Sequence, residues 1–147
     1  MLQPSLPRAC VVAAARGWIG TPYRHQASLK GVGCDCLGLV RGVWREIVGN
    51  EPEAPPPYAP DWAEASGRER LMEAATRHLI EVSRDAFVEG DVLLFRWRDS
   101  LVAKHAAIVA TRATMIHAHD GAVVCEVALS PWWLRRLAFA FRFPGVV

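Results

Sequence analysis

Three segments in the first part of the chain have apolar residues at the spacing of an amphipathic helix. In the clearest of them, Cys36, Val40, Val43 and Ile47 fall at positions i, i+4, i+7 and i+11. The predicted helices run from about Arg8 to Trp18, from Cys36 to about Gly49, and from roughly Gly67 to Leu79.

From Ile80 onward the hydrophobic period changes to two, which is typical of β-strands. A tight turn is predicted at His119-Asp120-Gly121, and a one-turn helix near Ser130–Trp133. Helices followed by strands predict an α+β fold, with N-terminal helices packed on an antiparallel sheet of about five to six strands. The predicted strands are Val92–Trp97, Ala103–Ala110, Thr114–Ala118, Ala122–Val127 and Arg136–Phe143.

Size and composition favour one compact unit. A chain of 147 residues with 52% apolar residues is long enough to bury a core, so we expect a single domain over residues 1–147. Half of the residues from Glu51 to Pro60 are proline, which predicts an extended surface strap, with Trp62 holding its far end.

Charge and hydropathy exclude some partners. A net charge of +2 is too small to indicate a nucleic-acid ligand, and the arginines near the end are expected to form a solvated rim. We expect no membrane insertion, because no apolar stretch approaches the length of a spanning helix. The apolar run from Ala9 to Ala15 lacks the pattern of a signal peptide, so synthesis in the cytoplasm is expected.

The four cysteines are Cys10, Cys34, Cys36 and Cys125, and their spacing does not resemble a disulfide framework. We therefore expect free thiols. Cys36 is a candidate nucleophile, because it begins a predicted helix directly after Asp35, a good N-cap. The positive end of the helix dipole would favour its thiolate. The alternative is that Cys36 is an ordinary small buried residue.

His105 and His117 strengthen the case for chemistry at Cys36. They lie twelve residues apart on consecutive predicted strands, symmetrically about Thr111. With that register their side chains would be directly opposed on one face. His105 would then take the thiol proton or hold the thiolate in an ion pair, and His117 would orient the base. If either is misassigned, His25 and His119 in the loops are the substitutes, whereas His78 is expected at the surface or core edge.

A zinc site made of Cys34, Cys36, His105 and His117 is the main competing interpretation, because these are suitable ligand types. The Cys-x-Cys spacing is poor for zinc, and neither a metal nor a cofactor is expected. Tyr23 follows a Gly-Thr-Pro break and either donates a hydrogen bond to substrate or packs as a surface aromatic residue.

Five short motifs together resemble the NlpC/P60 family of cysteine peptidases, whose fold is a reduced papain-like α+β domain. The match keeps order and spacing over nearly the whole chain. The motifs are Gly-Thr-Pro-Tyr (20–23), Asp-Cys-Leu-Gly-Leu-Val (35–40), Gly-Asp-Val-Leu-Leu-Phe (90–95), His-Ala-Ala-Ile-Val (105–109) and Ile-His-Ala (116–118).

This resemblance implies a peptidase that cuts peptidoglycan stem peptides, typically between γ-D-glutamyl and a diamino acid. It implies that Cys36 is the nucleophile, His105 the base and His117 the third polar residue. It also implies that Tyr23 lines the active site and that Asp35 helps to bind the free amino group of the substrate.

The proline strap, Lys104-His105 and Pro131-Trp132-Trp133 resemble most the branch found in tailed phages and gene transfer agents. That branch implies a tail or baseplate partner and local action in the cell wall. Two rival hypotheses stay open. One is a structural tail component with a relict active site that docks through Trp62, Trp132 and Trp133. The other is an amidase or acyltransferase with the same fold and another substrate.

The sequence departs from the family pattern in two places near Cys36. Leu37 stands where the family usually has serine, so substrate contacts there are expected to differ. Cys34 is an additional thiol, and the expectation is that it is inert.

Overall fold

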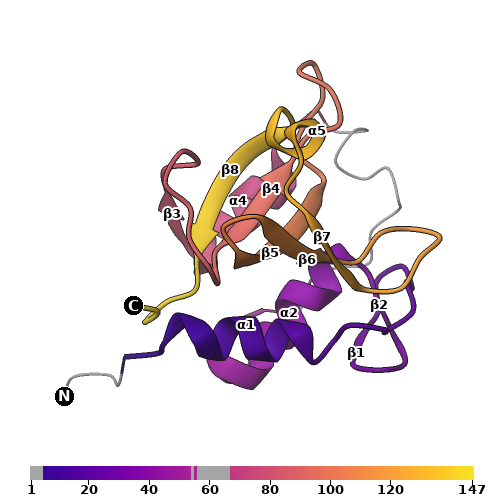
Figure 1. The fold of residues 1–147 in the computed structure, drawn as a ribbon, viewed down its shortest axis with the longest axis vertical. Coiled ribbons are helices and arrows are strands. Elements are labelled where there is room, and N and C mark those ends of the chain that lie inside the picture. Colours follow the sequence, from indigo (N-terminus) through magenta and orange to yellow (C-terminus); the bar gives the residue numbers. More distant parts are fainter. Residues whose placement is uncertain (1–4, 54, 56–66) are drawn as a thin grey trace.

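The computed structural model describes residues 5–53, 55 and 67–147. It has an α+β fold in which helices precede most of the strands along the chain (Figure 1). The helices are α1 (Arg8–Arg16), α2 (Cys36–Ile47), α4 (Arg70–His78) and the one-turn α5 (Pro131–Leu134). A small ladder is formed by β1 (Ser28–Leu29) and β2 (Gly33–Cys34). The main strands are β3 (Ile80–Val82), β4 (Val92–Phe95), β5 (His105–Thr111), β6 (Thr114–His117), β7 (Cys125–Ala128) and β8 (Leu137–Arg142).

The six main strands form one antiparallel sheet in the order β3-β8-β4-β5-β6-β7. Helices α1 and α2 lie next to each other and both contact β5, so they cover one face of the sheet (Figure 1). This arrangement confirms the predicted fold class. It also places the first turn of α2 beside the beginning of β5.

Both faces of the central strands are buried. Along β4, Val92 and Leu94 face the core beneath the helices, whereas Leu93 and Phe95 belong to a second core on the opposite face. Phe87, Val127 and Trp133 pack against that second core. The uninterrupted apolar run Val-Leu-Leu-Phe is therefore a strand that is covered on both sides.

Most predicted elements are present with ends shifted by a few residues. The connection after β6 is longer than predicted. Strand β7 begins at Cys125 and not at the predicted Ala122, because residues 122–124 pair with residues 20–23 instead. Val124 donates to the Thr21 carbonyl at 2.8 Å, and Tyr23 donates to the Ala122 carbonyl at 3.2 Å. The predicted turn is present, because Ala122 donates to the His119 carbonyl at 3.2 Å, but it lies within a longer loop between β6 and β7 that packs against the segment carrying Tyr23.

Most of the predicted proline strap, together with Trp62, lies outside the described residues. The described part is held by ion pairs. Glu51 accepts from Arg41 at 2.6 Å and from Arg45 at 3.1 Å. Glu53 pairs with Arg77 and His78 at the end of α4, both at 2.9 Å. His78 is half-buried at the edge of the core, one of the two positions predicted for it.

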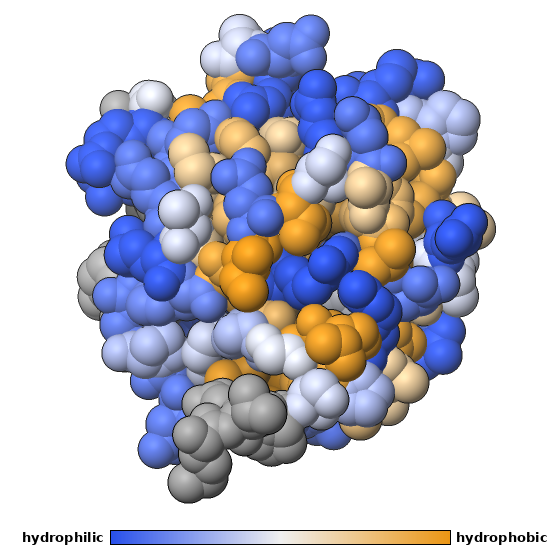
Figure 2. All heavy atoms as spheres, turned by 90° about the vertical axis from the view of Figure 1, so that its left-hand side faces the viewer, coloured by the Kyte–Doolittle hydropathy of each residue, from blue (hydrophilic) through white to orange (hydrophobic). Residues whose placement is uncertain are grey.

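The surface mixes apolar and polar residues. On the side of β3, hydrophobic residues form separate groups among hydrophilic ones (Figure 2). Ile80 of β3 is 56% exposed. Within the described part of the chain, no helix combines the length and the hydrophobicity needed to cross a membrane.

Candidate active site

Asp35 fixes the start of α2. Its Oδ1 accepts the backbone N–H of Gly38 at 2.7 Å, as expected for an N-cap. Its Oδ2 accepts the backbone N–H of Gln26 at 2.8 Å. The Asp35 side chain is buried, so these two bonds tie the loop before β1 to the first turn of α2. Cys36, the next residue, is therefore held in a defined place.

Gly38 allows the same loop to pass very close to α2. A Cβ atom at this position would lie 1.9 Å from the Ala27 carbonyl oxygen, which is far inside van der Waals contact. The Ser28 hydroxyl donates to the Gly38 carbonyl at 2.6 Å from the same loop. The glycine of the Asp-Cys-Leu-Gly motif is thus required by packing beside Cys36.

The Cys36 thiol lies against the backbone at the beginning of β5. Its Sγ is 3.9 Å from the Lys104 carbonyl oxygen. A second interaction, with the backbone N–H of Ala106, favours the thiolate. Lys104 and Ala106 flank His105, so the fold brings Cys36 and His105 together across 69 positions of sequence.

His105 and His117 form a buried imidazole pair. Nε2 of His105 lies 2.9 Å from Nδ1 of His117, and the two residues are only 4% and 5% exposed. This bond leaves Nδ1 of His105 as the ring nitrogen that can take a proton from a thiol. The structure therefore brings the three predicted catalytic residues to one place.

The predicted register of the two histidines was wrong. Thr111 and Thr114 flank a two-residue turn, so the hairpin is not centred on Thr111. The register of the two strands shifts next to this turn, so that Ile108 pairs with Ile116. In this register, the residue of β5 that lies directly opposite His117 comes two positions after His105. The imidazoles therefore meet along a diagonal of the sheet, which long and aromatic side chains can span.

Two tryptophans that the sequence reasoning did not assign to the site pack against His105. The ring centroid of Trp97 lies 5.3 Å from that of His105, and Trp133 lies at 5.5 Å, both with nearly parallel planes. Trp97 could have been found from alternation along the strand, since Phe95 pairs with His105. Trp133 was predicted as an exposed docking residue but is half-buried. No spacing of residues in the sequence indicated that it contacts His105.

Burial keeps the imidazole pair neutral. It lowers the pKa of His105 well below its usual value, with further lowering by His117 and His119. Burial and His119 lower the pKa of His117 to about 4. His119, in the loop after β6, has its ring centroid 5.7 Å from His105 and 5.8 Å from His117. At neutral pH, His105 is consequently an unprotonated base.

The thiol is also neutral at rest, contrary to the expectation from the helix dipole. Burial and the Asp35 carboxylate raise the pKa of Cys36 to about 12. The backbone N–H groups of Ala106, Leu37 and Cys36 lower it, but they do not outweigh the desolvation. The arrangement therefore suits proton transfer to His105 at the moment of attack better than a permanent ion pair.

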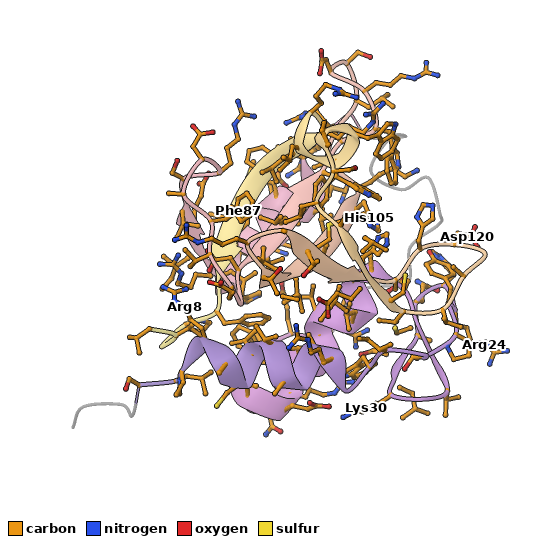
Figure 3. The ribbon with its side chains drawn as sticks, in the orientation of Figure 1. Arg8, Arg24, Lys30, Phe87, His105 and Asp120 are labelled. Carbon is orange, nitrogen blue, oxygen red and sulfur yellow. The ribbon has the colours of Figure 1, made fainter. Side chains whose placement is uncertain are left out.

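A pocket of about 340 Å³ opens over these groups. Tyr23 and Asp35 line it together with Cys36 and His105, whereas His117 is not among the lining residues. Burial raises the pKa of Tyr23 to about 12, so its phenol is a hydrogen-bond donor at neutral pH. His105 lies on β5, and the loop that carries Asp120 extends beyond it (Figure 3). The other lining residues are His25, Leu37, Leu71, Trp97, Lys104, Ala118, His119 and Asp120.

The other candidate groups do not assemble a metal site. All four cysteines are free thiols, as predicted. Cys34 is fully buried in the main core, where burial raises its pKa to about 12. Within residues 5–53, 55 and 67–147, no three His, Cys, Asp or Glu side chains are placed to share a metal ion.

Comparison with known structures agrees with this fold. An NlpC/P60 family protein from Bacillus cereus ATCC 10987 has a similar structure, with a TM-score of 0.69 and 19% identity over 95% of this chain. This chain spans 41% of that protein's length. The NlpC/p60 domain of the peptidoglycan hydrolase SagA gives a TM-score of 0.64 and 24% identity, over 94% of this chain and all of that one.

The peptidoglycan hydrolase RipB from Mycobacterium tuberculosis gives a TM-score of 0.59 and 17% identity, over 92% of this chain and 63% of that one. No curated protein matches the sequence. The model of the NlpC/P60 family matches residues 20–142, which contain every residue of the site. This chain therefore belongs to the NlpC/P60 family.

Proposed function

We propose that this protein is a cysteine peptidase that cleaves peptidoglycan stem peptides. The observation that carries the proposal is that Cys36 and His105 line one pocket and that His105 is bonded in turn to His117. The Cys36 thiol contacts the backbone next to His105, and the far nitrogen of His105 is bonded to His117 at 2.9 Å. This is the order of nucleophile, base and orienting group that acyl transfer requires. The descriptions of SagA and RipB as peptidoglycan hydrolases support the substrate class.

The first half of the reaction forms a thioester. Sγ of Cys36 attacks the carbonyl carbon of the scissile amide while Nδ1 of His105 takes the thiol proton. His105 then donates its other N–H to Nδ1 of His117, which stabilises the imidazolium. We assign stabilisation of the oxyanion to the backbone N–H of Cys36 and the Tyr23 hydroxyl, because both residues line the pocket. The C–N bond breaks, and the leaving amine takes the proton from His105.

The second half releases the acyl group. His105, neutral again, takes a proton from a water molecule as its oxygen attacks the thioester carbonyl. The C–S bond breaks, the proton returns to the Cys36 sulfur, and a carboxylic acid leaves. Each step moves one proton through His105, which is why a base that is neutral at pH 7 is useful here.

The finer specificity is part of the same proposal. We assign the scissile bond to the γ-D-glutamyl–diamino acid linkage, with Asp35 binding the free amino group of the substrate. Asp35 lines the pocket beside Cys36, and a carboxylate is a suitable partner for an ammonium group. We further propose that residues 1–147 act as one domain delivered to the cell wall by a phage-like tail, as the motif resemblance to that branch suggests.

The test is digestion of purified muropeptides with mass-spectrometric identification of the products. We expect cleavage by the wild type and none by Cys36→Ala. Cys10→Ala is the matched control, because Cys10 is an exposed free thiol away from the pocket lining. Unchanged cleavage by Cys36→Ala would overturn the proposal. Incorporation into tail particles without any cleavage would favour the structural role, and turnover of other amides or esters alone would favour the amidase or acyltransferase alternative.

A further inference from the structure

The wall of the pocket continues outward as a strip of aromatic rings. Trp97 lines the pocket and contacts His105. Its ring centroid lies 6.2 Å from that of Trp132 and 5.9 Å from that of Trp133. Trp132 and Trp133 are themselves in edge-to-face contact at 4.8 Å. A substrate that leaves the pocket on the Trp97 side therefore meets Trp132 next.

Helix α5 sends its two tryptophans in different directions. Trp133 packs inward against Phe95 and His105, whereas Trp132 remains 42% exposed. This one-turn helix lies at the ends of β4 and β8 (Figure 1). An exposed large aromatic residue next to a pocket adds little to the core, and such residues are common at binding sites.

Arg136 holds Trp132 in place. Its guanidinium carbon lies 3.6 Å from the centre of the Trp132 ring, and its Nη1 donates to the Trp132 carbonyl at 2.8 Å. The guanidinium thus covers one face of the indole, and the two groups form one ordered unit that offers hydrogen-bond donors next to the part of the ring that stays exposed. The arginines near the C-terminus were expected to form a solvated rim, but this one has a defined aromatic partner.

We propose that Trp132 and Arg136 bind a sugar ring of the glycan strand that carries the stem peptide. This inference rests on the proposed function. A pocket of about 340 Å³ accommodates only the portion of substrate around the scissile bond. The remainder lies outside, where a pyranose can pack its C–H face on the indole. Its hydroxyl and acetamido oxygens can accept hydrogen bonds from the guanidinium.

The experiment compares two probes for binding to the Cys36→Ala protein by calorimetry. One is a synthetic stem peptide, and the other is the same peptide attached to its disaccharide. Trp132→Ala is introduced in that background, with Leu134→Ala as the matched control, since Leu134 is 45% exposed on the same turn. Thermal unfolding of each variant reports whether α5 is retained. The same variants with Cys36 intact are then assayed for cleavage of both probes.

We expect Trp132→Ala to weaken binding of the disaccharide peptide by roughly two- to tenfold, which is the range for loss of one aromatic stack. Binding of the bare peptide should not change, and Leu134→Ala should behave as the parent. Equal binding of both probes by the parent, or equal weakening of both by Trp132→Ala, would overturn the sugar site alone. Failure of both probes to bind would reject the substrate class, and this inference with it. Loss of a tail partner with unchanged binding of both probes would assign the surface to protein contact instead.

Discussion

Nε2 of His105 lies 2.9 Å from Nδ1 of His117, although the two residues are not directly opposed across β5 and β6. The hairpin turn is displaced from the midpoint between them, so the rings meet diagonally. Trp97, which follows β4, and Trp133, which lies on α5, also pack on the His105 ring. The orientation of the base is therefore set by one hydrogen bond and two aromatic contacts.

His117 should act as a positioning residue, and its replacement should affect kcat more than KM. We expect His117→Ala to lower kcat by on the order of 10²-fold, a part of what general base catalysis contributes. His117→Gln should retain more activity, because its amide oxygen can still accept from the His105 ring. Steady-state kinetics on a muropeptide would measure both constants. His78→Ala on α4 is the control, and equal rates for His117→Ala and the wild type would contradict the orienting role.

Acid should weaken the fold through these histidines. The pKa of His117 is lowered to about 4 in the folded protein, whereas an unfolded histidine has a pKa near 6.5. Between these values the unfolded state binds the additional proton, so stability falls as the pH decreases and is unaffected by this group above 6.5. The expected loss from His117 is about 3 kcal/mol on reaching pH 4.

Urea unfolding at pH 7 and pH 4.5 would measure this loss. Protonation of ion-paired carboxylates also lowers the stability as the pH decreases. The informative quantity is therefore the difference in stability loss between the wild type and a His117 variant. His117→Gln should lose less stability than the wild type over that interval. An equal loss in both proteins would show that His117 is not held neutral by the fold.

Gly38→Ala should destabilise the protein and disturb the site. Its Cβ would lie 1.9 Å from the Ala27 carbonyl, a backbone atom that can move only if the loop moves. Overpacking of this kind typically costs about 1–3 kcal/mol. Gly17→Ala is the control, because the nearest atom there is the terminal nitrogen of the Lys30 side chain. Thermal unfolding would compare the two, and an equal change in both would refute the packing argument.

The sequence predicted most of the helices and strands, because their signals are local, but β1, β2 and β3 were not among the predicted strands. The helical stripe after Asp35 located the start of α2 at Cys36, and apolar runs bounded by turn residues located β4 and β5. The order of these elements along the chain then predicted that the helices pack on an antiparallel sheet. Tyr23, Asp35, Cys36 and His105 indeed share one pocket.

Features that depend on contacts between distant segments could not be obtained this way. The register of β5 and β6 depends on a two-residue turn and a bulge that apolar spacing does not reveal. The raised pKa of Cys36 depends on desolvation by the assembled fold, which here outweighs the local helix dipole. The contact of Trp133 with His105 requires α5 to fold back over the second core, and its position in the sequence carries no sign of that.

Asp91 should contribute more to stability than any surface carboxylate in an ion pair. It is fully buried and accepts from Arg142 at 2.8 and 2.9 Å and from the Val88 backbone N–H at 2.9 Å. Asp91→Asn would leave Arg142 without its charge partner, which should cost about 3 kcal/mol. Glu126→Gln is the matched control, because its pair with Arg16 is largely solvated and should contribute less than about 1 kcal/mol. Urea unfolding at pH 7 measures both variants, and similar small losses would mean that Asp91 is not a major anchor of β8.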